Sequence, residues 1–375
     1  MNSKIENAPF VELGDLIEIC DNRNIDKKYG INDVCGMTIE KEIIPTKADV
    51  KDTDLSKFYV VQPQEFVYNP RTHGRKIGLG FNNSDKSILI SWNNTAFKVK
   101  DMKHVVPTYL YMIFTREEWD REACFNSWGS STVVFSWEDF FKIKIPLPSI
   151  KTQNEVVAVY NGLKGLAEEN EKLLEPLSKS CEVFIADCKR KYEWKKLGDL
   201  IEDVDIKNFD NKIKAVKSVS ITKEFKETGT KVNKDELGGY KLVSPRHLSY
   251  VQTTKNEKCF ANALNTSDET YVVTSVNKVI KSKDEKKLDM GFLYLFFKRK
   301  EFDRYAIFNS WGSAREVFSY EDLCYVKIPL PPKEVQQKIV DLYNCYEECK
   351  RIANEARAKI NNLCPALVQK AAYSK

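Results

Sequence analysis

The sequence Phe-Asn-Ser-Trp-Gly-Ser at residues 125–130 recurs unchanged at residues 308–313. Around it, residues 116–148 and 299–331 are identical at 21 of 33 aligned positions, and both stretches end in Ile-Pro-Leu-Pro. A further string, Leu-Gly-Asp-Leu-Ile-Glu, lies near the start of each copy, at 13–18 and 197–202. Self-similarity at a fixed offset indicates a repeated structural unit. The chain is therefore predicted to contain two copies of one unit, whose ends agree and whose centres differ.

Each copy begins with a predicted domain of mixed secondary structure, at residues 1–149 and 194–332. Runs rich in β-branched residues that end in polar clusters predict strands at 87–99 and 270–280. Pro107 suits the first turn of a helix, which the apolar spacing extends to about residue 124. Each domain is therefore expected to be of the α+β class.

Each copy ends in a predicted long helix, at residues 150–193 and 333–375. Apolar side chains of the first helix repeat every seven residues along two lines, Val156, Leu163, Leu177 and Phe184, and Tyr160, Ala167, Leu174, Cys181 and Cys188. The second helix repeats the pattern with Ile339, Tyr346, Ala353, Ile360 and Leu367, beside Leu342, Cys349, Ala356 and Leu363. This repeat is typical of a coiled coil, so two long antiparallel helices are predicted to pair. The alternative is that each helix packs only on its own domain. Pro176 and Pro365 are expected to kink or end the helices.

Composition limits the class of protein. The 375 residues suit about two domains, and the 42% hydrophobic content is enough for buried cores. Lys and Arg number 59 against 54 Asp and Glu, a net charge of +5 that is compatible with a nucleic-acid partner. No run approaches the roughly 20 apolar residues that cross a bilayer, and the first residues lack an apolar signal segment, so a cytoplasmic protein without a membrane partner is expected. The ten cysteines include no Cys-x-x-Cys pair, which favours reduced thiols over a metal site.

The order of these features resembles the specificity subunit of type I restriction-modification systems. In that family a target recognition domain, a long helix, a second recognition domain and a second long helix follow one another. The resemblance covers essentially the whole chain. It is carried by Lys-Leu-Gly-Asp-Leu at 196–200, the two Ile-Pro-Leu-Pro segments, Gln153 and Gln336 at the helix starts, and Cys-Pro-Ala-Leu-Val-Gln-Lys-Ala at 364–371. The first helix departs from the usual ending, with Glu-Pro-Leu-Ser-Lys at 175–179 in place of a clean Pro-x-Leu run.

The resemblance implies a pseudo-twofold molecule that reads double-stranded DNA. Each recognition domain would read one half of a split target, and the paired helices would set the unread spacer. A helix of about 40 residues spans about 60 Å, or about 17 base pairs, which bounds the spacer from above. The implied partners are two modification (methyltransferase) subunits and an ATP-dependent restriction subunit. S-adenosylmethionine and ATP with Mg²⁺ would bind those partners, and this chain would carry no cofactor and no catalytic residue.

The divergent centres contain the candidate DNA contacts. Segment 69–80 of the first domain places cations in a glycine-containing loop, and arginine and asparagine can bind guanine and adenine in a bidentate manner. We therefore predict contacts by Arg71, Thr72, His73, Arg75, Lys76, Asn82 and Asn83. The second domain lacks arginine in the matching segment, 252–258, and its predicted contacts are Thr253, Lys255, Asn256 and Lys258. Different chemistry at matching positions suits two different half-sites. The alternative is a solvated loop without a partner.

The repeated hexapeptide needs a different role, because a motif identical in both domains cannot discriminate between unlike half-sites. It is expected to hold the fold or the phosphate backbone. Phe125 and Trp128 are predicted to be structural, with Trp128 in the core. Ser130, Ser313 and Arg315 are the candidate phosphate contacts.

Motifs for catalysis are missing from the sequence. It has no Gly-rich nucleotide loop, and Asn69-Pro70 is followed by Arg71-Thr72 rather than by the Pro-aromatic pair of adenine methyltransferases. The acidic pairs at 138–139 and 321–322 could bind a metal in a nuclease, but helix caps are favoured because no lysine accompanies them in both copies. Three functions remain open: DNA recognition, a cryptic nuclease or methyltransferase, and a two-domain scaffold that binds proteins.

Overall fold

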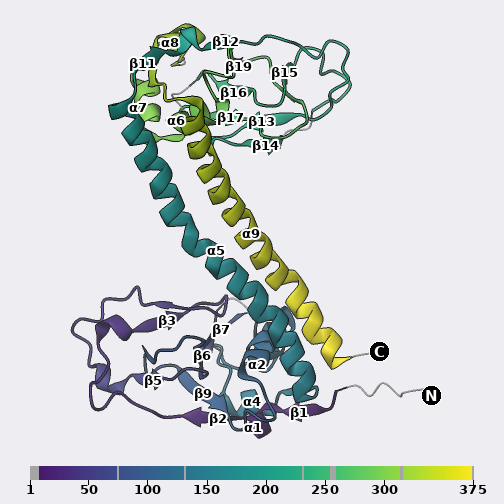
Figure 1. Ribbon diagram of the computed structural model, residues 1–375. Helices are drawn as coiled ribbons and strands as arrows, with labels where there is room; N and C mark the ends of the chain where they lie inside the picture. Colours follow the sequence, from purple (N-terminus) through teal and green to yellow (C-terminus); the bar gives the residue numbers. More distant parts are fainter. Residues whose placement is uncertain are drawn as a thin grey trace. The chain divides into compact units, whose positions relative to one another are not determined.

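The computed structural model divides the chain into two units (Figure 1). Unit 1 comprises Met1–Glu169 and Ile352–Lys375, and unit 2 comprises Asn170–Arg351. The structure describes residues 8–73, 76–130, 132–229, 232–253, 259–312 and 316–373. Each unit contains one domain of strands and short helices together with part of each long helix. The predicted pair of α+β domains with two long helices is confirmed.

The two long helices are continuous. They are α5 (Ile150–Lys191) and α9 (Lys333–Ala372), and Pro176 and Pro365 lie inside them. The expectation that these prolines end the helices is wrong. An internal proline costs about 3 kcal/mol, and apolar residues buried on both sides of each proline offset that cost.

The long helices pair with each other and also pack on the domains. In unit 1, Val156 and Val157 near the start of α5 share one core with Cys364 and Val368 near the end of α9, so the helices run antiparallel there. In unit 2, Ile185 and Cys188 near the end of α5 share a core with Ile339 near the start of α9. Both cores also contain the sheet and the short helices of the domain. Helix pairing and packing on the domain, posed above as alternatives, therefore occur together.

The helix seam differs from the seven-residue prediction at its far end. Phe184 is 51% exposed and Ile185 is 2% exposed, and likewise Leu363 is 43% exposed while Cys364 is 4% exposed. A straight helix of 3.6 residues per turn drifts by about 20° per heptad relative to a 3.5-residue repeat. After three or four heptads the drift approaches the 100° between successive residues, so the next residue faces the partner helix.

Each domain is built on a four-stranded antiparallel sheet with the same strand order. In unit 1 the order is β2 (Ile17–Cys20), β9 (Thr95–Val99), β6 (Phe66–His73) and β7 (Lys76–Phe81). In unit 2 it is β12 (Ile201–Asp203), β19 (Asn277–Ser282), β16 (Leu248–Val251) and β17 (Asn262–Leu264). Alternating side chains separate the two faces: Phe66 and Tyr68 join the helical core, and Val67 joins a smaller cluster behind the sheet.

Two-stranded pairings complete each domain. Unit 1 pairs β1 (Phe10–Glu12) with β10 (Lys144–Pro146), β3 (Cys35–Met37) with β4 (Ile43–Pro45), and β5 (Tyr59–Val61) with β8 (Ile88–Ile90). Unit 2 pairs β11 (Trp194–Lys196) with β20 (Lys327–Pro329), β13 (Lys217–Val219) with β14 (Phe225–Glu227), and β15 (Lys241–Val243) with β18 (Tyr271–Val273). Each predicted long strand is therefore two strands, because a turn separates β8 from β9 and another separates β18 from β19.

Short helices cover one face of each sheet. They are α1 (Leu13–Leu16), α2 (Pro107–Phe114), α3 (Glu117–Phe125) and α4 (Trp137–Lys142) in unit 1, and α6 (Met290–Lys298), α7 (Lys300–Phe308) and α8 (Tyr320–Tyr325) in unit 2. Three single turns of 3-10 helix lie at Ile31–Asp33, Leu55–Lys57 and Leu197–Asp199. The predicted helix at 107–124 is divided in two at Thr115 and Arg116. One residue of each acidic pair takes part in a helix cap: Ser136 and Ser319 cap α4 and α8 and bond Asp139 and Asp322.

Candidate nucleic-acid interface

The predicted DNA loop of unit 1 is the tip of the hairpin formed by β6 and β7. The two strands pair from Phe66 to Tyr68, then shift register and pair again at Thr72 and His73. In the shifted stretch β6 pairs instead with the segment after the repeated hexapeptide, because Arg71 bridges to Val134 and the Phe135 amide donates to the Pro70 carbonyl at 2.7 Å. Pro70 has no amide hydrogen to give to β7, which favours this change of partner. The hairpin tip therefore lies beside the hexapeptide.

The predicted contacts at this tip differ in their exposure and in the bonds that they form. Arg71 is exposed, Thr72 is half-buried with its hydroxyl 3.3 Å from the Val133 carbonyl, and Lys76 forms an ion pair with Glu40 at 3.1 Å. The side chain of His73 and the whole of Arg75 lie outside the described residues. In unit 2, Thr253 bridges to Val317 as Arg71 bridges to Val134. The remaining predicted contacts of unit 2 lie outside the described residues: Lys255, Asn256, Lys258, Ser313 and Arg315.

The assignment of Asn82 as a base-reading residue is corrected by the structure. Asn82 is buried, and its Nδ2 donates to the carbonyls of Val61 and Lys86 at 3.0 and 2.9 Å. Asn265 does the same in unit 2 with Val243 and Glu269. The amide holds a turn and is not available to a base. The repeated Asn-x-Ser-Asp at 82–85 and 265–268 was the signal for this role. The neighbouring Asn83 is exposed.

The polar residues of the hexapeptide close the end of a helix. Asn126 Nδ2 donates to the Glu122 carbonyl at 2.8 Å, and Ser127 Oγ donates to the Ala123 carbonyl at 2.6 Å, so both satisfy carbonyls in the last turn of α3. Asn309 and Ser310 do the same for α7. Gly129 has a φ of +144°, and a Cβ there would lie 2.0 Å from the Thr132 carbonyl oxygen, so the turn requires glycine. Ser130 is exposed.

The aromatic residues of the hexapeptide are on the surface, which contradicts the prediction that they are structural. Phe125 and Trp128 are 81% and 70% exposed, and Phe308 and Trp311 are 83% and 72% exposed. The core beneath is filled by other rings, which include Trp119 and Phe135 in unit 1. Helical spacing could have revealed this: Trp119 and Ala123 are buried on one face of α3, and Phe125 lies about 200° from Ala123.

A buried ion pair that was not predicted from the sequence holds the segment that follows the hairpin tip in each domain. Lys41 Nζ donates to Asp120 Oδ1 at 2.7 Å and to the Ile77 carbonyl at 2.6 Å, and the Ile77 amide donates to the same Asp120 oxygen at 3.1 Å. Burial lowers the pKa of Lys41, and the hydrogen bond with Asp120 opposes that shift. Ile77 follows Lys76 directly, so the pair holds the strand that leaves the predicted DNA loop.

Unit 2 repeats this arrangement. Lys223 Nζ is 2.7 Å from Asp303 Oδ1, which accepts the Phe260 amide at 2.8 Å. Lys41 and Lys223 both have left-handed backbones, with φ of +68° and +63°. Ile-x-Lys-Glu at 39–42 and 221–224 marks both sites in the sequence. We call each arrangement, Lys41 with Asp120 and Lys223 with Asp303, a lysine–aspartate clamp.

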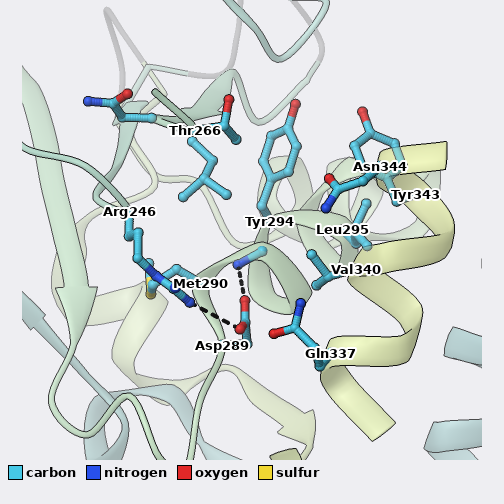
Figure 2. A pocket seen from close by; sticks show the side chains of 13 residues that line it. Arg246, Thr266, Asp289, Met290, Tyr294, Leu295, Gln337, Val340, Tyr343 and Asn344 are labelled. Atoms are coloured by element: carbon cyan, nitrogen blue, oxygen red, sulfur yellow. Dashed lines mark hydrogen bonds and ion pairs between the residues drawn. The ribbon is translucent and has the colours of Figure 1, made fainter. Parts of the chain in front are cut away.

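A cavity of about 440 Å³ lies between α6 and α9 in unit 2 (Figure 2). Its buried carboxylate, Asp289, accepts from the Gly291 amide at 2.8 Å and forms ion pairs with Arg246 at 3.2 Å and Lys333 at 2.7 Å. Burial alone would raise the pKa of Asp289, but the Lys333 and Gly291 hydrogen bonds lower it overall. A carboxylate held this way is a helix cap and a poor general base.

Among the residues that the structure describes, no three His, Cys, Asp or Glu side chains gather in a way that could hold a metal ion. Within the same residues, none of the helices combines the length and the apolar character needed to cross a membrane.

The chain is similar to a family model and to solved structures. A family model described as "Type I restriction modification DNA specificity domain" matches twice, at residues 5–173 and 189–362. A similar solved structure is the type I restriction-modification S subunit from M. genitalium, with a TM-score of 0.59 at 12% identity, covering 100% of this chain and 98% of that one. The HsdS subunit from Thermoanaerobacter tengcongensis also matches, with a TM-score of 0.39 at 14% identity, covering 99% and 97%. No curated protein matches the chain.

Proposed function

This chain belongs to the family of type I restriction modification DNA specificity domains, and from that premise we propose that it reads a bipartite double-stranded DNA target with one domain per half-site. One observation carries the proposal. Arg71 and Thr253 occupy the same bridge in the two domains, each beside an identical hexapeptide and at the base of a loop whose sequence differs. Two unlike half-sites require the same backbone arrangement with different side chains at the position that contacts the bases.

The long helices are proposed to set the spacer between the half-sites. The 42 residues of α5 correspond to about 63 Å at 1.5 Å per residue, which is an upper bound of roughly 18 base pairs. Each long helix contributes side chains to a domain core near both of its ends, which supports a fixed attachment rather than a flexible tether.

The proposed partners supply the chemistry. Two modification subunits would carry S-adenosylmethionine and methylate adenine, and a restriction subunit would bind ATP with Mg²⁺ and cleave. The chain itself is proposed to be non-catalytic. The purified chain alone is therefore expected neither to cleave DNA nor to transfer methyl groups. Either activity would favour the cryptic enzyme. If the chain assembled normally with its partners but the complex did not bind DNA sequence-specifically, the protein-binding scaffold would be favoured.

A domain exchange tests the modular assignment. Residues 194–332 would be replaced by the recognition domain of another family member, and methylated adenines would be mapped in cells that also carry the modification partner. We expect one half-site to change and the other half-site and the spacer to remain. A simultaneous change of both half-sites would show that the domains do not read separately.

Loss of the hairpin arginines tests the contacts themselves. Arg71→Ala and Arg75→Ala are each expected to weaken target binding by about 1–3 kcal/mol where the guanidinium reads a base. Loss of an arginine that contacts only phosphate would instead reduce the slope of log affinity against log salt concentration by about one. Gel shifts over a salt series with the modification partner present measure both quantities. The exposed Lys172→Ala on α5 is the matched control for loss of one charge. Unchanged affinity and slope for both arginine variants would remove the hairpin from the interface.

A further inference from the structure

We propose that the exposed aromatic residues of the repeated hexapeptide bind the sugar–phosphate backbone of duplex DNA without regard to its sequence. In unit 1 this surface consists of Arg121, Phe125 and Trp128, and in unit 2 of Arg304, Phe308 and Trp311. We call each set an aromatic patch. The inference rests on the proposed function and adds to it a second class of contact, which supplies affinity and no discrimination.

Phe125 and Phe308 lie at the ends of α3 and α7, and each of these helices buries another aromatic residue. Trp119 on α3 and Phe302 on α7 are each 3% exposed, whereas the four patch rings are 70–83% exposed. Arg121 lies one turn before Phe125, and Arg304 one turn before Phe308, so each cation shares a helix face with an exposed ring. Both arginines are themselves exposed. Cation and ring side by side suit a ligand that is both anionic and partly apolar.

The turn fixes the main chain of each patch tryptophan before any ligand arrives. The Trp128 amide and carbonyl both bond to Val134 at 2.9 Å, and those of Trp311 both bond to Val317 at 3.1 and 3.0 Å. Asn126 and Ser127, like Asn309 and Ser310, bond helix carbonyls as described above. A main chain that is already fixed need not be ordered on binding, which reduces the entropy cost of the contact.

Position argues for DNA as the ligand. Val134 bridges on one side to Trp128 and on the other to Arg71, and Val317 bridges in the same way to Trp311 and Thr253. The patch is therefore two strand spacings, about 10 Å, from the variable residue of each proposed interface. A duplex seated on the hairpin would reach it. The sugar–phosphate backbone is the part of two unlike half-sites that is chemically the same, which explains why the patch is identical in both domains.

Paired substitutions test the inference in the full chain with its modification partner. The variants are Phe125→Ser with Trp128→Ser, and Phe308→Ser with Trp311→Ser. The probes are a duplex of random sequence and a duplex of equal length that carries the mapped target. We expect each pair to weaken binding of both duplexes by the same factor, about tenfold or more from the lost burial of aromatic surface, so that the specificity ratio is unchanged. Trp128→Phe should retain most of the affinity.

Control variants separate this role from folding. Trp92 is another exposed tryptophan of unit 1, packed edge-on against Phe58, and Trp92→Ser should leave both affinities unchanged. Because the patch rings are exposed, the paired variants should unfold at the same temperature as the parent chain.

Three results would overturn the inference. A loss of partner-subunit binding with unchanged DNA affinity would make the patch a protein-binding surface, and a loss confined to the target duplex would make it a base-reading element. Both would leave the proposed function standing. If the parent chain with its partner bound neither duplex, the proposed function would fail and the inference with it.

Discussion

The variant Asp120→Leu is expected to lower the free energy of unfolding of unit 1 by about 3–5 kcal/mol. The substitution leaves Lys41 charged and almost fully buried without its carboxylate, and it also removes the acceptor of the Ile77 amide. Such a loss is a large part of the stability of a typical domain, so the tip end of the proposed DNA hairpin should open. Urea denaturation and hydrogen exchange at the Ile77 amide measure the two effects.

The pH dependence of this variant follows from Lys41. Burial lowers its pKa below the ordinary value, so the unfolded chain binds more protons than the folded chain between the two pKa values. Stability therefore rises with pH in that alkaline window, and the deficit of Asp120→Leu should shrink there. Combining Lys41→Met with Asp120→Leu removes the buried charge and should restore most of the stability. Asp85→Leu, at an exposed acidic residue, is the matched control. If Asp120→Leu and Asp85→Leu had the same free energy of unfolding, the clamp would contribute nothing to the stability of unit 1.

The variant Gln336→Leu is expected to cost about 3 kcal/mol and to loosen the second domain from its helix. Gln336 is fully buried in the first turns of α9. Its Oε1 accepts the Asp289 amide at 2.8 Å, and its Nε2 donates to the carbonyls of Lys287 and Pro331 at 2.7 and 2.8 Å. Leucine fills similar space and satisfies none of these groups. Gln153 makes the same three kinds of bond at the start of α5, to the Val106 amide and to the His104 and Pro148 carbonyls.

A functional readout follows if the helices set the spacer. A loosened joint should let the complex methylate targets whose spacers are longer or shorter than the mapped one, which the parent chain rejects. The adjacent Gln337→Ala is the matched control, because that side chain is exposed and bonds Asp341 along the same helix. Gln336→Leu with unchanged stability and unchanged spacer preference would mean that this joint does not fix the geometry.

Repetition in the sequence predicted the architecture well, because it reports which segments must adopt the same structure twice. The α+β domains and the long helices follow from it. Repetition does not report whether a side chain faces inward, so it could not show that Trp128 lies on the surface. The prediction that Trp128 is in the core is wrong for that reason. The seam prediction failed at Phe184 because a fixed seven-residue repeat ignores the drift of a straight helix. The lysine–aspartate clamp was missed because Lys41 and Asp120 are 79 residues apart and meet only through the fold.

The structure leaves some of the candidate DNA contacts accessible and buries another. Arg71 and Asn83 are exposed as a DNA contact requires, and Asn82 is not, because a short amide side chain can serve a turn as readily as a base. Nothing in a single residue type distinguishes these roles. Comparison of the two copies distinguishes them, because Asn82 and Asn265 make the same bonds in domains whose proposed targets differ. A residue with the same bonds in both domains has a structural role.

The clamp has a consequence for how such a protein can change. Asp120 and Asp303 accept hydrogen bonds from main-chain amides, those of Ile77 and Phe260, at the far ends of the two variable loops. A main-chain amide is present whatever side chain is attached to it, proline excepted. Mutations can therefore accumulate in the loops while their anchoring survives. The domain can therefore accept substitutions in the loop without losing the stability that this anchoring provides.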